Sequence, residues 1–165
     1  MAADRNKLIK GIQMQKIGDV TKAIGYIDIR VFAHATENQG KVETATKNLF
    51  PQELTENIVF QKTVLSGHHS NSIIMLTTRL ADRKLLPAAL EKIGGKLSTL
   101  DKQQLNDDIK LHLENGNLYL RFDKQAAYLG HPKLMQNDPI HVKVHFKNKT
   151  NDKVVELAQQ FGLLL

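Results

Sequence analysis

The chain has 165 residues, which is about the size of one domain and is long enough to bury a hydrophobic core. It contains no cysteine, which excludes disulfide bonds, catalytic thiolates and zinc sites built from cysteine. Its formal net charge of +6 at pH 7 favours a polyanionic partner, and it has no apolar run of the roughly 20 residues that a membrane-spanning helix needs.

The sequence divides into a basic N-terminal extension and a series of alternating or periodic segments. The pattern of residues 1–22 fits either a helix or a loose tail. In chain order the further elements are a strand over 23–34, a helix over 36–50, strands over about 58–65 and 73–80, helices over 82–93 and 98–108, strands over 110–113 and 117–122, a short helical turn that ends at Gly130, a strand over 140–147 and a final helix that Thr150 caps.

Capping and breaking residues set the expected helix boundaries. Thr36 and Ser98 are the expected N-caps of their helices. Pro87 should kink the helix over 82–93 or move its start to about Leu86. The pair of glycines that begins at Gly94 should stop the same helix.

The strands alternate apolar side chains with polar or aromatic ones, as half-buried strands do. The dipeptide Asn115-Gly116 predicts a tight hairpin between two of them. Strand pairs with short turns, separated by helices, predict an α+β fold over residues 23–165. We expect a single two-layer domain, with a mostly antiparallel sheet and helices packed on one face.

Three segments resemble a known family. IRVFAHATENQGKVETATKNLFP (29–51), HSNSIIML (69–76) and LYLRFDKQAAYLG (118–130) are similar to archaeal proteins described as predicted RNA-binding, exosome-associated proteins. The resemblance covers about residues 23–163. It implies a fold like that of the large-subunit ribosomal protein that binds 5S RNA, and RNA as the partner, with subunits of an RNA-processing complex as further possible partners. It implies no catalytic residues.

One face of the predicted sheet gathers aromatic and basic side chains. Aromatic rings can stack on unpaired bases, and arginine and lysine can bind phosphates. The candidate RNA-binding residues are Tyr26, Arg30, Phe32, His34, Arg79, Tyr119, Arg121, Lys124, His141, Lys143, His145 and Lys147. Three alternatives remain: the face is merely solvated, a helix covers it and Phe32 is core, or the lysines and histidines of 140–147 protect a sheet edge.

Metal and enzyme sites have weaker support. His141 and His145 would lie roughly 13 Å apart on a strand, too far to share a zinc ion, and no metal or cofactor is expected. Asp123, Lys124, Tyr128 and His131 could act as an acid–base cluster in a small hydrolase. The simpler interpretation is that Asp123 caps the short helix, with Lys124 exposed and Tyr128 packed under the sheet.

We therefore expect a non-catalytic RNA-binding protein of the archaeal cytoplasm, without a membrane partner. The expected setting is exosome-linked RNA processing or decay, or ribosome-linked RNA handling. The basic ends of the chain are a second candidate RNA contact. The alternative function is a protein-interaction module, in which Ile73, Met75 and Phe32 form an apolar patch for a subunit or a dimer partner.

Overall fold

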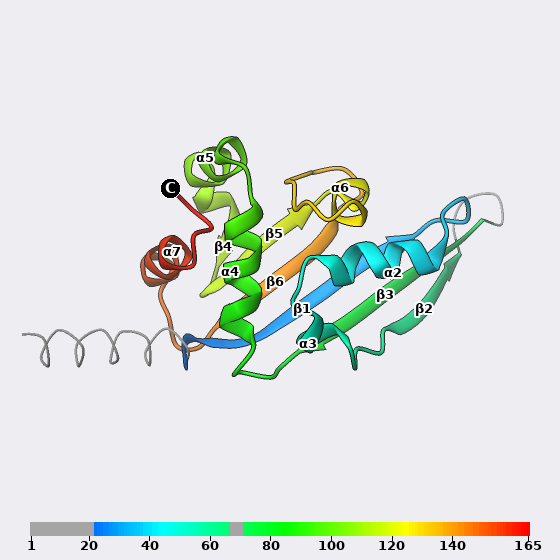
Figure 1. Ribbon diagram of the computed structural model, residues 1–165, viewed down its shortest axis with the longest axis horizontal. Helices are drawn as coiled ribbons and strands as arrows, with labels where there is room; N and C mark the ends of the chain where they lie inside the picture. The colour runs from blue at the N-terminus through cyan, green and yellow to red at the C-terminus, as the bar shows by residue number, and fades with distance from the viewer. Residues whose placement is uncertain (1–21, 67–70) are drawn as a thin grey trace, which may run out of the picture.

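Six antiparallel strands form the sheet at the centre of the computed structural model, which describes residues 22–66 and 71–165 (Figure 1). The expectations for residues 1–21 lie outside the described residues. The strands are β1 (Ile24–Ala33), β2 (Gln61–Ser66), β3 (Ser72–Leu80), β4 (Leu113–Glu114), β5 (Asn117–Phe122) and β6 (Ile140–Phe146), in the sheet order β2-β3-β1-β6-β5-β4.

The helices cover one face of this sheet, so that the molecule has two layers (Figure 1). They are α2 (Gln39–Asn48), α3 (Gln52–Thr55), α4 (Leu86–Lys96), α5 (Thr99–Asp107), α6 (Lys124–Tyr128) and α7 (Asn151–Gln160). This arrangement confirms the predicted α+β class. Within the described part of the chain, none of the helices has the length and apolar character needed to cross a membrane.

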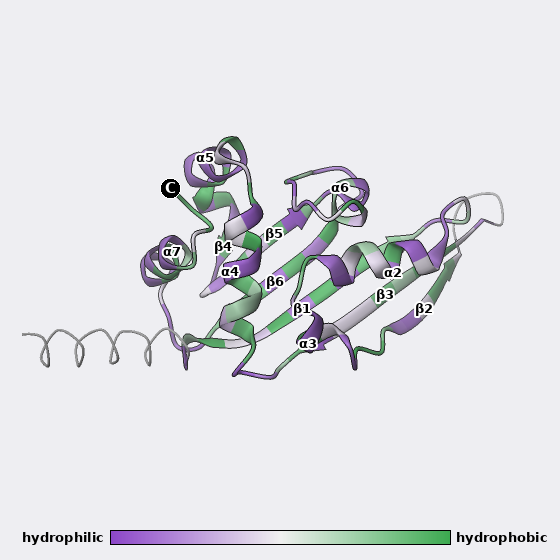
Figure 2. Cartoon of the chain, viewed as in Figure 1, coloured by the Kyte–Doolittle hydropathy of each residue, from purple (hydrophilic) through white to green (hydrophobic). Residues whose placement is uncertain are grey.

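The core lies between the inner face of the sheet and the helices. On β1, Ile27, Ile29 and Val31 are buried and alternate with residues that are partly exposed. Figure 2 shows the same alternation as hydrophobic and hydrophilic bands along the strands. β6 lies between β1 and β5, so the alternative in which its lysines and histidines protect a sheet edge is wrong.

The predicted N-caps of α5 and α7 are confirmed, and that of α2 is wrong. The side chains of Ser98 and Thr150 accept hydrogen bonds from backbone N–H groups in the first turns of α5 and α7. The N-cap of α2 is Asn38 rather than Thr36, because the Asn38 side chain accepts from the N–H of Lys41, 3.0 Å away. Glu37, which lies between these two residues in the sequence, accepts a hydrogen bond from Lys124 instead.

Other boundaries also differ from the sequence expectation. α4 begins at Leu86, with Pro87 in its first turn, as predicted. Its two glycines do not stop it, because the helix continues to Lys96. Most of the strand expected over 110–113 is instead a 3-10 turn at Ile109–His112. The hairpin at Asn115-Gly116 is confirmed, with positive φ angles at both residues.

Candidate nucleic-acid interface

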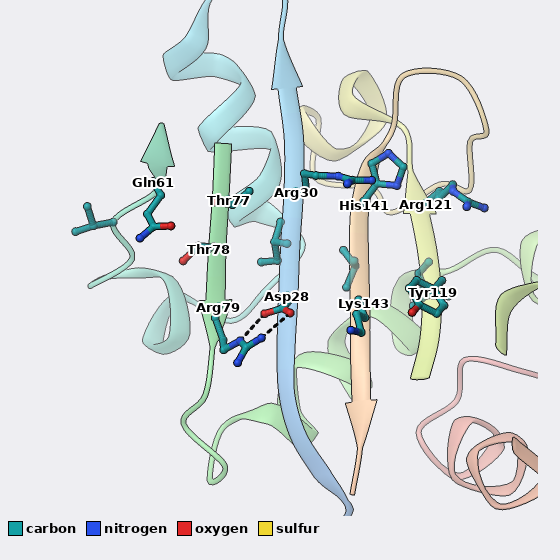
Figure 3. A pocket seen from close by; sticks show the side chains of 14 residues that line it. Asp28, Arg30, Gln61, Thr77, Thr78, Arg79, Tyr119, Arg121, His141 and Lys143 are labelled. Atoms are coloured by element: carbon teal, nitrogen blue, oxygen red, sulfur yellow. Dashed lines mark hydrogen bonds and ion pairs between the residues drawn. The ribbon is translucent and has the colours of Figure 1, made fainter. Parts of the chain in front are cut away.

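The outer face of the sheet, opposite the helices, holds an open groove of about 720 Å³ (Figure 3). Because side chains alternate along each strand, β1, β3, β5 and β6 all direct polar or aromatic residues into it. The charged and aromatic residues that line it are Asp28, Arg30, Arg79, Tyr119, Arg121, His141 and Lys143. Six of these seven are sequence-predicted site residues, so the structure brings the centre of the expected site together.

Strand register places three of these residues in one line across the sheet. Arg121 on β5 pairs with His141 on β6, and His141 pairs with Arg30 on β1. We call these three residues the basic row. The line continues to Thr77 and Gln61, so no carboxylate belongs to it. The imidazole of His141 therefore has one permanently charged arginine on the strand at each side of it.

His141 is electrostatically perturbed by its position in the basic row. Partial burial, and then the positive charges of Arg30 and Arg121, lower its pKa below the ordinary value of histidine. The charge of Asp138 opposes this effect without cancelling it. His141 therefore favours the neutral state in the free protein.

The next line along the strands contains Asp28, the one carboxylate among the described residues that line the groove. Asp28 pairs in register with Arg79 on one side and with Lys143 on the other. Arg79 donates two hydrogen bonds to Asp28, with N–O distances of 2.6 and 2.9 Å (Figure 3). The bond to Asp28 raises the pKa of Arg79, so this arginine is firmly charged but already paired.

Tyr26 is enclosed by its neighbours. The His145 ring stacks on it at a centroid distance of 4.6 Å, and the Arg79 guanidinium carbon lies 3.8 Å from its centroid. Two groups so close cannot share one side of the ring, so both faces of Tyr26 are covered. His145 is held in turn by Asn117, because its Nδ1 atom lies 2.7 Å from the side-chain oxygen Oδ1 of Asn117. We call Tyr26, Asp28, Arg79 and His145 the paired cluster.

Tyr119 differs from Tyr26 because its ring is not enclosed. It stands next to Lys143 across the β5–β6 pair and lines the groove. Among the described residues, the stacking and cation–π contacts involve Tyr26, Phe32 and Tyr128 but not Tyr119. It is therefore the tyrosine that can offer a ring face to a base.

Phe32, Met75 and Ile73 continue the outer face beyond the basic row. Phe32 and Met75 are cross-strand partners, and Ile73 lies two residues further along β3, opposite Leu65. Phe32 is half-buried, and the Arg30 guanidinium lies 5.8 Å from its centroid. Phe32 is thus on the outer face and not in the helix-covered core, which corrects one of the alternatives.

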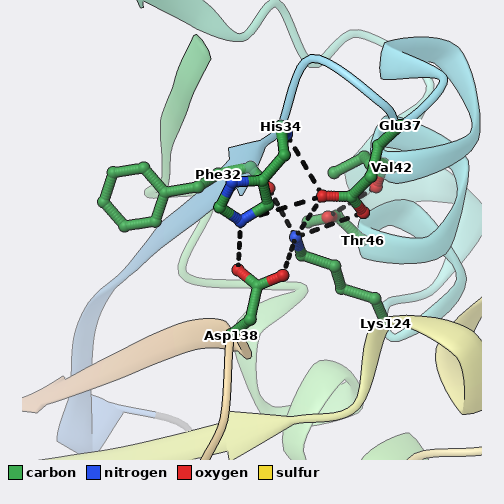
Figure 4. Close-up of polar contacts among 7 residues, drawn as sticks. All are labelled: Phe32, His34, Glu37, Val42, Thr46, Lys124 and Asp138. Carbon is green, nitrogen blue, oxygen red and sulfur yellow. Dashed lines mark hydrogen bonds and ion pairs between the residues drawn. The ribbon is translucent and has the colours of Figure 1, made fainter. Parts of the chain in front are cut away.

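Two sequence-predicted site residues belong to a separate ionic cluster (Figure 4). Lys124 donates to Glu37 at 3.1 Å, to Asp138 at 2.8 Å and to the carbonyl oxygen of Phe32. His34 Nε2 lies 3.0 Å from Asp138. We call His34, Glu37, Lys124 and Asp138 the Lys124 cluster. Lys124 is only 12% exposed, so the expectation of an exposed lysine is wrong.

The Lys124 cluster resembles a metal site in composition, because ligand atoms of His34, Glu37 and Asp138 lie within 4.8 Å of one another. The ammonium group of Lys124 contacts both carboxylates, so a positive charge already stands between them. Burial tends to raise the pKa of Asp138, but the bonds from Lys124 and His34 outweigh it and lower that pKa.

The proposed acid–base residues of the 123–131 segment each have a different environment. Asp123 caps α6 by accepting from the N–H of Ala126, as predicted. Tyr128 is 40% exposed, with Lys41 over its ring, so its expected position under the sheet is wrong. His131 is exposed, and Lys124 is directed to its own cluster.

Sequence reasoning missed the residues that pair with the predicted ones. Asp28 contacts Arg79, Asn117 contacts His145, and Glu37 and Asp138 contact Lys124. Asp28 and Asn117 lie within strands, and Glu37 and Asp138 lie in the segments between elements. The alternation along β1 does indicate that Asp28 faces outward. The partner on another strand depends on register, which a local pattern does not contain.

Comparison with known proteins gives archaeal relatives. A family model described as RNA binding matches residues 26–146. An RNA-binding protein of Pyrococcus abyssi is 36% identical over 124 residues, covering 73% of this chain and 80% of the relative. An uncharacterized protein of Methanocaldococcus jannaschii is 27% identical over 146 residues, covering 82% and 97%. A solved DUF54 protein of Methanothermobacter thermautotrophicus is similar with a TM-score of 0.68 and 28% identity, covering 84% and 98%.

Proposed function

Because the chain belongs to the family described as RNA binding, we propose that it binds RNA through the outer face of its sheet. The observation that supports this face is the basic row, a line of two arginines and one histidine that contains no carboxylate. Arg30 and Arg121 would bind phosphate oxygens through their forked donors. Lys143 would add a further charge, and Tyr119 would stack on a base.

The paired cluster limits what the rest of the predicted site contributes. Arg79 is bound to Asp28 and both faces of Tyr26 are covered, so neither offers much to an incoming RNA. Lys124 and His34 stabilise the fold around the end of β1 instead. The proposed contacts therefore concentrate on the β1, β5 and β6 part of the groove.

The proposed role is non-catalytic and lies in archaeal RNA processing or decay. Two observations support it: the relatives are archaeal, and the family resemblance seen in the sequence points to exosome-associated proteins with a fold like a 5S RNA-binding ribosomal protein. Subunits of an RNA-processing complex are the partners that this role implies. A pull-down from an archaeal extract, with and without ribonuclease, tests whether such subunits bind directly.

Fluorescence anisotropy with single-stranded RNA tests the face. We expect Arg30→Ala and Arg121→Ala each to weaken binding roughly tenfold, because each removes a charge-assisted contact. The slope of log affinity against log salt should fall by about 0.7 for each lost phosphate contact, measured from about 50 to 300 mM salt. Arg83→Ala is the matched control, since Arg83 is exposed in the turn between β3 and α4.

Equal losses in all three variants would contradict the outer-face assignment, since they would reflect net charge alone. Absence of RNA binding at low salt would favour the alternative function, a protein-interaction module. That alternative is supported by a line of apolar residues on the outer face. Phe32 is the cross-strand partner of Met75, and Ile73 is the cross-strand partner of Leu65. A protein partner on this line would bind with little dependence on salt.

A further inference from the structure

The three side chains of the basic row come from three neighbouring strands. Figure 3 shows the side chain of Arg30 extending from β1 towards the ring of His141, whereas that of Arg121 extends from β5 away from this ring. Because neighbouring strands lie about 4.8 Å apart, the Cα atoms of the two arginines are about 10 Å apart. An arginine side chain is long enough to span half of this separation, so both guanidinium groups can bind one phosphate group above His141 once the Arg121 side chain turns towards it.

We propose that the basic row binds one phosphate group of single-stranded RNA and that His141 takes up a proton from solvent as the phosphate binds. This inference rests on the proposed function, because it assigns a subsite within the RNA-binding face. Tyr119 lies two residues along β5 from Arg121, about 6.6 Å away. An unpaired base can stack there while its strand crosses the row, whereas a duplex keeps its bases inside.

The charges that face His141 come from three parts of the fold. Arg30 on β1 and Arg121 on β5 are positive, and they add to the effect of burial in lowering the pKa of His141. Asp138, in the segment before β6, acts in the opposite direction. Its carboxylate is held by Lys124 and His34, so it does not neutralise the row.

A bound phosphate changes this balance, because it brings negative charge to a position between the two arginines. The pKa of His141 then rises, and the protonated ring becomes a third cationic ligand. RNA affinity must accordingly increase as pH falls, starting at the pKa of His141 in the complex and ending at its lower pKa in the free protein. Each unit of difference between these two values corresponds to a tenfold change in affinity.

The test is the pH dependence of binding to labelled oligouridine, measured from about pH 8 to about pH 6 at constant salt. We expect the wild-type protein to gain about tenfold in affinity over this range, and His141→Gln to lose most of the gain. His131→Gln is the matched control, because His131 is exposed after α6 and outside the groove. An NMR titration should show the pKa of His141 rising when the RNA binds.

Two RNAs distinguish the possible sources of the phosphate. One is oligouridine with hydroxyl groups at both ends, and the other is the same RNA with a 5′-phosphate. A pH-dependent gain with hydroxyl ends assigns the row to a backbone phosphodiester, and a gain only with the 5′-phosphate assigns it to a terminal group. RNA binding with an unchanged His141 pKa, and with equal pH dependence in all variants, would overturn the inference while leaving the proposed function intact. Failure to bind RNA at any pH would instead overturn both.

Discussion

Asp28 determines how much positive charge the outer face presents. It neutralises Arg79 through two hydrogen bonds, and it is also the cross-strand neighbour of Lys143. An exposed pair of this kind contributes little to stability, at most about 1 kcal/mol. Its larger effect is on the charge of the groove, because it offsets the charge of Arg79 and leaves the arginines of the basic row without a carboxylate partner in their line.

Asp28→Asn should therefore tighten RNA binding, because it removes the carboxylate of the groove and releases Arg79. We expect a gain of roughly fivefold at about 100 mM salt, with a smaller gain at higher salt. Asp107→Asn, at the exposed end of α5, changes the net charge equally and should have little effect. The measurement is anisotropy with single-stranded RNA. Weaker binding by Asp28→Asn would show that the ion pair itself contacts the ligand.

Asp138 has a different role, since its carboxylate stabilises the fold through Lys124 and His34. Its pKa is lowered in the folded protein, so it favours folding above the ordinary aspartate pKa of about 3.9, and this contribution is lost as pH falls through the lower folded value. We expect Asp138→Asn to destabilise the protein near pH 7 and to do so less near pH 3, where the contribution of the carboxylate is being lost. Urea unfolding at the two pH values measures this, and an equal difference at both would contradict it.

At the scale of elements, the close contact between α4 and the end of α7 depends on one glycine. A Cβ atom at Gly94 would lie 2.8 Å from the carbonyl carbon of Gly162 and closer still to the backbone oxygen of Phe161. These are backbone atoms, so they cannot move aside as a flexible side chain would. A Cβ atom at the neighbouring Gly95 would meet nothing within 4 Å.

The two glycines form a matched pair of tests. Gly94→Ala should lower the free energy of unfolding by about 2 kcal/mol, because α4 must shift away from α7. Gly95→Ala should raise it by about 0.5 kcal/mol, because alanine loses less backbone entropy than glycine in a helix. Thermal unfolding of both variants measures the difference. Similar values for the two would mean that the α4–α7 contact is looser than the structure shows.

The ends of the helices could be predicted only in part from the sequence. Ser98 and Thr150 are correct N-caps, although Thr99 directly follows the first and Asn151 directly follows the second. Thr36 is followed by Asn38, whose side chain can cap equally well, and tertiary contacts decide between them. Gly94 and Gly95 look like a stop signal, but the first is required by a contact with a distant segment and the second leaves the helix intact.

At the scale of the whole molecule, the sequence could predict which face of the sheet each strand residue occupies. It could not predict which residues of other segments lie beside it. Alternation placed Arg30, Arg121 and His141 on the outer face, and the structure agrees. The pairing of Asp28 with Arg79 and the burial of Lys124 depend on register and packing between segments far apart in the chain. These interactions determine which residues can bind a ligand and which are already bound to a neighbouring side chain.

The position of β6 in the sheet also constrains how the chain can fold. β1 and β3 can pair early, but the other edge of β1 must wait for a strand close to the C-terminus, as the pairing of Ile27 with Val144 shows. Closing so long a loop is entropically costly and slows folding. During synthesis on the ribosome, this edge of β1 therefore stays open until β6 has emerged, and the part of the groove between β1 and β6 cannot form before then.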